Sequence, residues 1–229
     1  MSLVGKKVVI TGANGVLGSA VVAKALELKA EHLALIDIVV GQPLADAIEQ
    51  KISRHVVDLT DLSATRECLE SLSGVDVVLN LAGGFDMGPT TYEVTDESWD
   101  FLFNLNVKTM HNVVRAAVPL MLKNGGGSIV NIGAIGAVHG NANMSAYSAS
   151  KGVVMKLTES LSQEVRHQGI NVNAVLPSVI DTERNRQDMP DVDPNVWVKP
   201  EQLANVICFL ASDAAGAVHG ALVPVCGLS

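Results

Sequence analysis

Short apolar runs alternate with longer segments of helical periodicity along nearly the whole chain. The runs predict strands and the periodic segments predict helices. Strands are expected near 6–11, 33–38, 54–57, 75–81, 127–132, 170–176 and 221–225, and helices near 16–29, 61–72, 98–123, 146–168 and 200–212. This alternation predicts a doubly wound α/β fold, with a mainly parallel seven-stranded sheet covered by helices on both faces. No repeat or low-complexity linker interrupts it, so we expect one domain over residues 1–229.

A glycine-rich turn follows the first predicted strand and opens the first predicted helix. Glycines at this spacing let the backbone turn tightly, approach a pyrophosphate and pack the helix on the strand. The helix N-terminus favours negative charge. A tight turn without a ligand is the alternative interpretation. The motif predicts a dinucleotide site of the Rossmann type, with contacts from Gly12, Asn14, Gly15, Val16, Leu17 and Gly18.

A carboxylate ends the second predicted strand, since Leu33-Ala-Leu-Ile-Asp37 stops nineteen residues beyond Gly18. An acidic side chain at this place can accept hydrogen bonds from a ribose 2′-hydroxyl, and it would repel the 2′-phosphate of NADP. Asp37 therefore predicts a preference for NAD(H) over NADP(H).

Tyr147 and Lys151 lie four residues apart in a predicted helix, so their side chains share one face. A neighbouring positive charge favours the phenolate, and we expect Lys151 to lower the pKa of Tyr147 toward neutrality. Such a pair could exchange a proton with a substrate. Because Tyr-x-x-x-Lys also arises by chance, an ordinary surface pair is the alternative.

From Lys6 to about Gly227 the ordered motifs resemble the short-chain dehydrogenase/reductase family. The resemblance implies an oxidoreductase that moves a hydride between a nicotinamide and a carbonyl or alcohol, with Tyr147 as general acid/base. It implies that Lys151 binds the nicotinamide ribose and that Asn106 holds a water in the proton relay. Further cofactor contacts implied by the family pattern come from Asp58, Leu59, Asn80, Ala82, Gly83, Pro177, Ile180 and Thr182.

One position departs from the family pattern, because Ala134 stands where many members carry a serine that donates to the substrate carbonyl. Loss of one such donor commonly costs about 3 kcal/mol of transition-state stabilisation. The chain could be a non-catalytic NAD-binding sensor, a slow enzyme, or an enzyme whose substrate needs no serine. His139 or Ser145 could alternatively supply a donor. The predicted substrate pocket comprises Ala134, His139, Asn143, Met144 and Ser145.

The third interpretation has a precedent in the dihydropteridine reductase branch, which the chain also resembles and which has a small apolar residue at the serine position. A quinonoid, pterin-like ring is already activated, so a hydride and one proton from Tyr147 suffice. A 3-oxoacyl (acyl-carrier-protein) reductase or another carbonyl reductase is the second candidate.

Substrate identity is expected to depend on the polar segment 183–197, which we interpret as a mobile lid. Arg184 and Arg186 could clamp an anionic substrate there. The alternative is a solvated loop in which the arginines pair with Glu183, Asp188 or Asp191. Trp197 and Met189 could roof an aromatic ring, although a tryptophan in such a turn more often packs into the core.

The composition of the chain bears on which classes of partner it could bind. A net charge of −8 and a pI near 5.2 argue against nucleic acid and anionic membranes. No apolar run is long enough to span a bilayer and no leader precedes Val4, so we expect a cytoplasmic protein. Three scattered cysteines and six unclustered histidines suggest neither disulfides nor a metal site.

The family resemblance also implies a homodimer or homotetramer, in which the long helices near 98–123 and 146–168 pair between subunits. The alternative is that the apolar faces of these helices only cover the sheet.

Overall fold

The computed structural model describes residues 1–43 and 45–229. Its seven strands form one sheet in the order β3-β2-β1-β4-β5-β6-β7, and every neighbouring pair is parallel. The strands are β1 (Lys7–Thr11), β2 (His32–Asp37), β3 (Ile52–Val56), β4 (Val77–Asn80), β5 (Gly127–Ile132), β6 (Ile170–Pro177) and β7 (Leu222–Val225). The predicted doubly wound α/β fold is confirmed.

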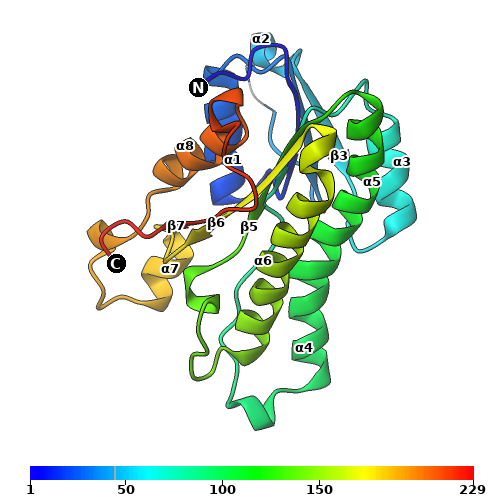
Figure 1. The fold of residues 1–229 in the computed structure, drawn as a ribbon. Coiled ribbons are helices and arrows are strands. Elements are labelled where there is room, and N and C mark those ends of the chain that lie inside the picture. Colours follow the sequence, from blue (N-terminus) through cyan, green and yellow to red (C-terminus); the bar gives the residue numbers. More distant parts are fainter. Residues whose placement is uncertain (44) are drawn as a thin grey trace.

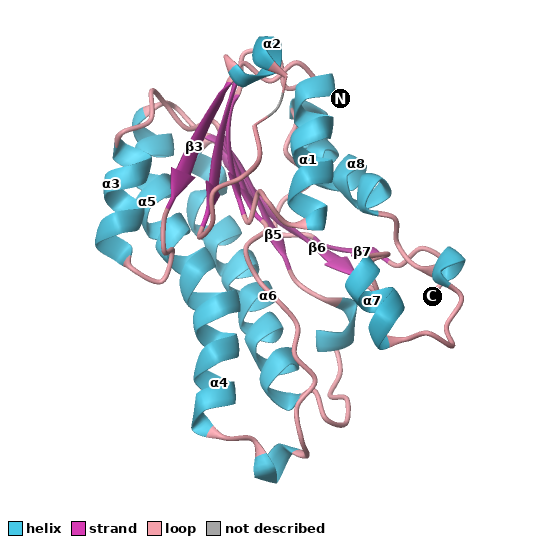
Figure 2. Ribbon diagram, turned by 180° about the vertical axis from the view of Figure 1, so that it is seen from behind, coloured by secondary structure: helices cyan, strands magenta, loops and turns pink. Residues whose placement is uncertain are grey.

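Helices cover both faces of the sheet (Figure 1). Helices α1 and α8 lie on one side, and α3, α5 and α6 lie on the other, as the view from behind also shows (Figure 2). The helices are α1 (Val16–Glu27), α2 (Asp46–Glu49), α3 (Leu62–Glu70), α4 (Asp96–Phe103), α5 (Thr109–Lys123), α6 (Ser145–Val165), α7 (Glu183–Asp188) and α8 (Pro200–Leu210).

The two layers explain why the strands read as continuous apolar runs. In β1, Val8 and Ile10 pack into the cluster under α1 and α8, whereas Val9 packs into the cluster under α3, α5 and α6. Successive side chains of a strand point to opposite faces, and in a parallel sheet both faces are buried. All eight residues of β6 are buried for the same reason.

The long helix predicted near 98–123 is one continuous rod with a local change of winding. It consists of α4, a π-helical turn at Asn104–Lys108, and α5. π-Helical turns are rare and occur mostly as single turns at functional sites. The helix α2 and the short helix α7, which lies inside the predicted lid, were not expected from the hydrophobic pattern because both are short and polar.

The order of the strands reverses between β1 and β4. The chain runs outward from β1 to β3 on one side of the sheet and then from β4 to β7 on the other. In doubly wound sheets, ligands bind in the crevice outside the carboxyl ends of the strands at this point of reversal.

Candidate active site

The glycine-rich turn lies at the carboxyl end of β1 and brings β4 and α1 close to it. Gly12 has a φ of +63°, and a Cβ added there would lie 2.9 Å from the backbone of Ala82. A Cβ on Gly18 would collide with the carbonyl oxygen of Gly12. Only glycine fits either position. The turn therefore packs backbone against backbone, as the sequence predicts.

Helix α1 presents an open N-terminus. Its N-cap is Gly15, which has no side chain to accept from the first-turn amides, and the first turn holds no acidic residue. Uncapped amides at a helix start favour an anion such as a phosphate. This end of α1, with Val16 and Leu17 in its first turn, fits the pyrophosphate of a dinucleotide.

Asp37 is fixed at the end of β2 by the glycine-rich turn itself. Its Oδ2 accepts from the backbone N–H of Asn14 at 3.0 Å, and its Oδ1 accepts from that of Ile38 at 2.8 Å. The side chain of Asn14 donates to the carbonyl of Val39 at 2.8 Å. The structure thus brings together two residues that the sequence predicts for one site and orients the carboxylate.

Asp58 lies exposed at the carboxyl end of β3, where it is oriented by Thr60. One carboxylate oxygen accepts from the backbone N–H and the hydroxyl of Thr60, and these hydrogen bonds lower the pKa of Asp58. The neighbouring residue, Leu59, is buried, and its carbonyl accepts from the side chain of Asn112 on α5 at 2.9 Å. The predicted pair Asp58 and Leu59 is therefore anchored to the helix layer.

The segment Asn80–Gly83, at the end of β4, is held over the turn by Thr11. The hydroxyl of Thr11 accepts from the backbone N–H groups of Leu81 and Ala82, both at 3.1 Å. The Asn80 side chain instead points into the sheet and donates to Asn131 at 2.8 Å. Unlike the backbone of Leu81 and Ala82, the side chain of Asn80 thus makes its contact inside the sheet, with a residue of β5.

Gly83 marks the centre of the predicted catalytic group. A Cβ there would lie 2.8 Å from Oδ1 of Asn106 and 3.2 Å from Nζ of Lys151. The three residues come from the loop after β4, the π-helical turn and α6, so the fold gathers residues that are far apart in the sequence.

Asn106 is buried and clamps the backbone of Gly84 through both of its polar groups. Its Oδ1 accepts from the Gly84 N–H at 2.9 Å, and its Nδ2 donates to the Gly84 carbonyl at 3.1 Å. Its Nδ2 also lies 3.1 Å from the hydroxyl of Ser150, which donates to the carbonyl of Tyr147. The amide of Asn106 thus ties the loop after β4 to the first turns of α6.

Tyr147 and Lys151 point into the same region from α6, but their pKa values differ from the expectation. Burial raises the pKa of Tyr147 to about 12, and burial lowers the pKa of Lys151 to about 8. The Lys151 ammonium donates to the carbonyl of Ile132 at 3.0 Å. The prediction that Lys151 lowers the pKa of Tyr147 toward neutrality is therefore wrong, because burial of the phenol disfavours the charged phenolate.

Pro177 ends β6, and Ile180 and Thr182 follow it in the next segment. Ile180 forms an isolated parallel bridge with Val198, and the hydroxyl of Thr182 accepts from the Asn185 N–H at the start of α7. Three residues that the family resemblance implies as cofactor contacts thus lie just before the lid segment.

Ion pairs inside the lid segment use both of its arginines. Arg186 binds Asp181 through two hydrogen bonds of 2.6 and 2.8 Å, and Arg184 lies 3.6 Å from Asp188. The predicted pairing of Arg184 is confirmed, whereas the partner of Arg186 was not among those expected. Trp197 is 3% exposed and packs into the core, which confirms the packing alternative.

The predicted substrate wall follows β5. Ala134 is 4% exposed, and it places a methyl group where a hydroxyl was expected. His139 and Asn143 are exposed on the connecting loop, and Asn143 has a φ of +60°. The carbonyl of Asn143 accepts from the Gly88 N–H at 2.9 Å. This contact joins the loop after β5 to the loop after β4.

The two candidate replacements for the missing serine differ in position from Tyr147. Met144 is the N-cap of α6, and Ser145 follows it with a buried hydroxyl that has no hydrogen-bond partner. Residues two apart on a helix lie about 200° apart around its axis, so Ser145 and Tyr147 occupy different faces of α6. His139 lies on the exposed loop. Neither has a described contact with the phenol.

Sequence reasoning missed the side chains that hold the site together. Thr11, Asn112 and Ser150 contact backbone or side chains of predicted site residues, and Phe85 contacts the phenol itself. A hydroxyl residue at the end of the apolar run 7–11, directly before Gly12, is the one signal that the sequence gave for Thr11. The others depend on which elements pack together, which a single sequence does not state.

Neither a membrane segment nor a metal cluster occurs in the part of the chain that is described. Within residues 1–43 and 45–229, no helix is both long and apolar enough to cross a membrane. Across the same residues, no three His, Cys, Asp or Glu side chains gather as ligands for a metal ion, and the three cysteines are free.

Known proteins match the chain over nearly its full length. The family model described as short chain dehydrogenase matches residues 6–193. A 3-oxoacyl-(acyl-carrier-protein) reductase FabG from Thermotoga maritima is 31% identical, and the match covers 99% of this chain and 98% of that protein.

Solved structures match the fold as closely. A candidate NAD(P)-dependent gluconate 5-dehydrogenase from Beutenbergia cavernae with bound NADP is 30% identical, with a TM-score of 0.89 over 99% of this chain and 97% of that chain. Carveol dehydrogenase from Mycobacterium avium in complex with NAD is 25% identical, with a TM-score of 0.85 over 97% of this chain and 96% of that chain.

Proposed function

The chain belongs to the short-chain dehydrogenase/reductase family and is an NAD(P)-dependent oxidoreductase, and from this we propose that it reduces a carbonyl or quinonoid carbon with Tyr147 as the proton donor. One observation carries the proposal. Asn106 and Lys151 lie against Gly83, and the ring of Tyr147 contacts that of Phe85 on the same loop, at the crevice where the strand order reverses. We further propose that the whole chain, residues 1–229, acts as one domain.

The cofactor we propose is NAD(H) in preference to NADP(H). The uncapped start of α1 would hold the pyrophosphate, and Asp37 would accept from the ribose hydroxyls and repel a 2′-phosphate. Asp58 and Leu59 would contact the adenine. When bound, the reduced nicotinamide supplies the hydride. Lys151, Pro177, Ile180 and Thr182 would hold its ribose and carboxamide.

Side chains of the protein itself would carry out the proton transfer. With a pKa of about 12, Tyr147 keeps its proton at neutral pH and can donate it to the oxygen of a carbonyl that is being reduced. Lys151, with a pKa of about 8, can return a proton to the phenolate near neutral pH. Asn106 fixes the loop of Gly84 beside both groups. The alcohol is oxidised when the same steps run in reverse.

The substrate we favour is activated and needs no second oxygen donor, because Ala134 offers none. A quinonoid, pterin-like ring fits this requirement. The second candidate is a 3-oxoacyl thioester, which the similarity to the Thermotoga maritima reductase supports. Ala134, Asn143 and Met144 would line the pocket in either case.

A substrate panel tests the proposal. Oxidation of NADH by the purified protein is measured against simple ketones, 3-oxoacyl thioesters, quinones and quinonoid pterin. We expect turnover of at least one activated class, and Tyr147→Phe lowers it by about a thousandfold. NADH binding without turnover of any class would refute the proposed reaction, as would full activity of Tyr147→Phe.

Subunit association is part of the proposal, as a homodimer or homotetramer. The exposed side of the α4–α5 rod is acidic in its first half, with Glu97, and basic in its second, with Lys108 and Arg115. Phe101 is exposed in the same rod. Two antiparallel copies would place each acidic half against a basic half. A separate groove of about 530 Å³ lies along α6 and is lined by residues such as Ala149, Gly152 and Val153.

Charge exchange tests the association. Light scattering should show that Arg115→Glu weakens the oligomer and that Glu97→Arg together with Arg115→Glu restores it. A monomeric wild-type protein would contradict the proposed association.

For the cellular location we propose the cytoplasm, a placement that agrees with a pI near 5.2 and free cysteines.

A further inference from the structure

We infer that Phe85 is a specificity-determining residue, and that the substrate is a planar, uncharged or cationic ring that packs on it beside Tyr147. The inference rests on the proposed function and narrows its substrate class. It is drawn from three features of the molecule: an exposed aromatic ring against the phenol, a rigidly held loop, and an exposed carboxylate next to that ring in the sequence.

Phe85 contacts the candidate proton donor directly. The ring centroids of Phe85 and Tyr147 lie 4.9 Å apart with an interplanar angle of 81°, an edge-to-face arrangement. Despite this contact, Phe85 remains 45% exposed. An exposed aromatic surface next to a largely buried phenol offers apolar area to whatever approaches that hydroxyl.

The loop that carries Phe85 is anchored on both sides of the ring. On one side, Asn106 binds the N–H and the carbonyl of Gly84. On the other, the Gly88 N–H donates to the carbonyl of Asn143. A side chain held by such neighbours loses little further freedom when a ligand packs on it, so Phe85 is preorganised for contact.

Met87 extends the apolar surface on the same loop, since it is 61% exposed. Across the joined loops, the methyl group of Met144 lies against Gly136. Phenylalanine and methionine side chains make a surface that adapts to flat apolar ligands. Neither kind of side chain offers a strong hydrogen-bond donor to the charged group of a substrate.

Residues 81–90, which carry Phe85, contain one charged side chain, that of Asp86. Between Arg66 and Lys108 the chain has no lysine or arginine but eight acidic residues, whereas the other sixteen acidic residues equal the sixteen Lys and Arg in number. This stretch includes Asp86, which is exposed beside Phe85. Of the other seven acidic residues, Glu67 and Glu70 lie on α3, Asp76 accepts from the Lys7 N–H at the start of β1, and the rest are Glu93, Asp96, Glu97 and Asp100.

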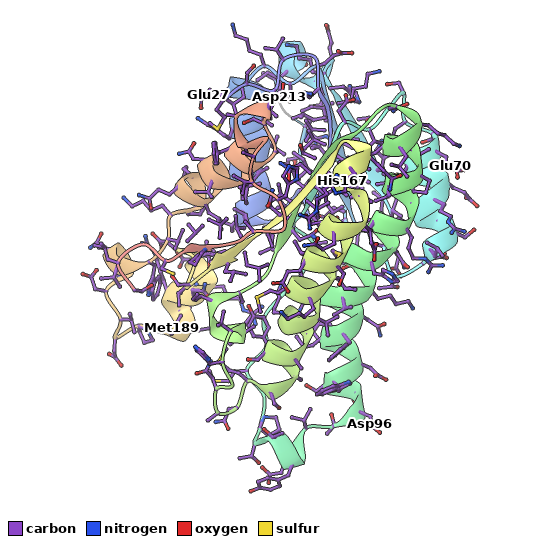
Figure 3. The ribbon with its side chains drawn as sticks, in the orientation of Figure 1. Glu27, Glu70, Asp96, His167, Met189 and Asp213 are labelled. Atoms are coloured by element: carbon purple, nitrogen blue, oxygen red, sulfur yellow. The ribbon has the colours of Figure 1, made fainter. Side chains whose placement is uncertain are left out.

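The opposite side of the entrance offers no free guanidinium. In the described lid segment, Arg184 and Arg186 are both paired with aspartates. Figure 3 marks Met189 at the end of α7 and Asp96 at the start of α4, on the two sides of this end of the molecule. An anionic substrate would therefore meet repulsion from Asp86 without a guanidinium to bind it, which favours a neutral or cationic ring.

The first experiment compares Phe85→Leu and Phe85→Trp with the wild type on a planar aromatic ketone or quinone and on a small aliphatic ketone. We expect Phe85→Leu to lower kcat/KM for the planar substrate about tenfold, mainly through KM, and to change that for the aliphatic ketone less than twofold. Phe85→Trp should restore the planar preference. The control is Tyr92→Leu, because Tyr92 is 86% exposed on the neighbouring turn.

A second experiment tests the charge filter. Asp86→Lys should raise about fivefold the ratio of kcat/KM for an aromatic ketone bearing a carboxylate to kcat/KM for its uncharged analogue. Added salt should reduce this gain. Glu70→Lys, at the end of α3, is the matched control (Figure 3). An unchanged ratio of kcat/KM for the two ketones in Asp86→Lys would overturn the proposed charge filter.

The outcomes separate this inference from the proposed function. Equal losses for planar and aliphatic substrates in Phe85→Leu would overturn the specificity role, since Phe85 would then act only through Tyr147. Turnover that depends on Tyr147 but shows no planar preference would leave the proposed function intact and refute the inference. A wild-type protein that binds NADH and reduces no substrate would refute both.

Discussion

The nucleotide end and the substrate end of the crevice are built differently. At the nucleotide end, Asp37 is held by backbone N–H groups, and Thr11 holds the segment after β4. At the substrate end, Phe85 and Met87 are exposed and Ala134 contributes a methyl group. One end is preorganised by hydrogen bonds, and the other offers apolar surface on anchored loops.

This difference separates recognition of the cofactor, which is general, from recognition of the substrate, which is specific to the proposed enzyme. Hydrogen-bonded backbone at strand ends recognises a dinucleotide, which many oxidoreductases share. Exposed apolar side chains select a substrate by shape and contact. Between the two ends lie the buried Lys151 and Asn106 and the partly buried Tyr147, whose geometry both ends depend on.

Removal of the amide of Asn106 should have the largest effect on stability. Asn106→Ala leaves the two polar groups of Gly84 and the hydroxyl of Ser150 without their partner, so we expect the free energy of unfolding to fall by about 3 kcal/mol. Urea unfolding measures this change. Asn104→Ala, at an exposed position in the same turn, is the control and should change it by less than about 0.5 kcal/mol. Equal effects would contradict a special role for the buried amide.

The burial of Lys151 predicts a pH dependence of stability. Its pKa is about 8 in the folded protein and 10.5 when unperturbed, so the unfolded chain binds the proton more tightly. The contribution of Lys151 to stability is therefore lowest below pH 8 and rises as the pH approaches 10.5. We expect the free energy of unfolding to rise by about 2 kcal/mol more between pH 8 and 10 in the wild type than in Lys151→Met. Identical slopes in the two proteins would show that the ammonium is solvated.

A hydroxyl at the substrate end would make that end resemble other members of the family. Ala134→Ser should raise kcat/KM for simple aliphatic ketones about tenfold, because it adds a donor for the carbonyl oxygen. The rate with an activated quinonoid substrate should change less than twofold. Steady-state kinetics on both substrates, with NADH affinity as the control, decide the result. No gain for ketones would mean that the missing serine is not what limits them.

At the nucleotide end, Asp37→Ala should narrow the preference for NADH over NADPH severalfold, because the repulsion of the 2′-phosphate is lost. Fluorescence titration with each cofactor gives the ratio of dissociation constants. Asp46→Ala, on α2 at an exposed position, is the control with the same change of charge. An unchanged ratio in Asp37→Ala would refute the proposed selector.

The fold was predictable because its elements are long and its strands are apolar on both faces. All seven strands and the five longest helical segments lie where the pattern of apolar residues predicts them. The π-helical turn at Asn106 and the short helices α2 and α7 were not predictable, since they depend on packing and on local capping such as that by Thr182.

The site was predictable where spacing along the sequence fixes it, and less so where it depends on which elements pack together. Tyr147 with Lys151, and the glycine-rich turn with Asp37, follow from such spacing. The contact of Phe85 with Tyr147 joins residues from different elements, and the pKa of Tyr147 depends on its burial. Neither is encoded in a local pattern.

The most direct test of the central claim is a pair of measurements on the wild type and Tyr147→Phe: the dissociation constant of NADH and the single-turnover rate of its oxidation by a planar activated substrate. We predict an NADH dissociation constant that changes less than twofold and a rate that falls about a thousandfold. A rate within tenfold of the wild type would contradict the claim that Tyr147 donates the proton.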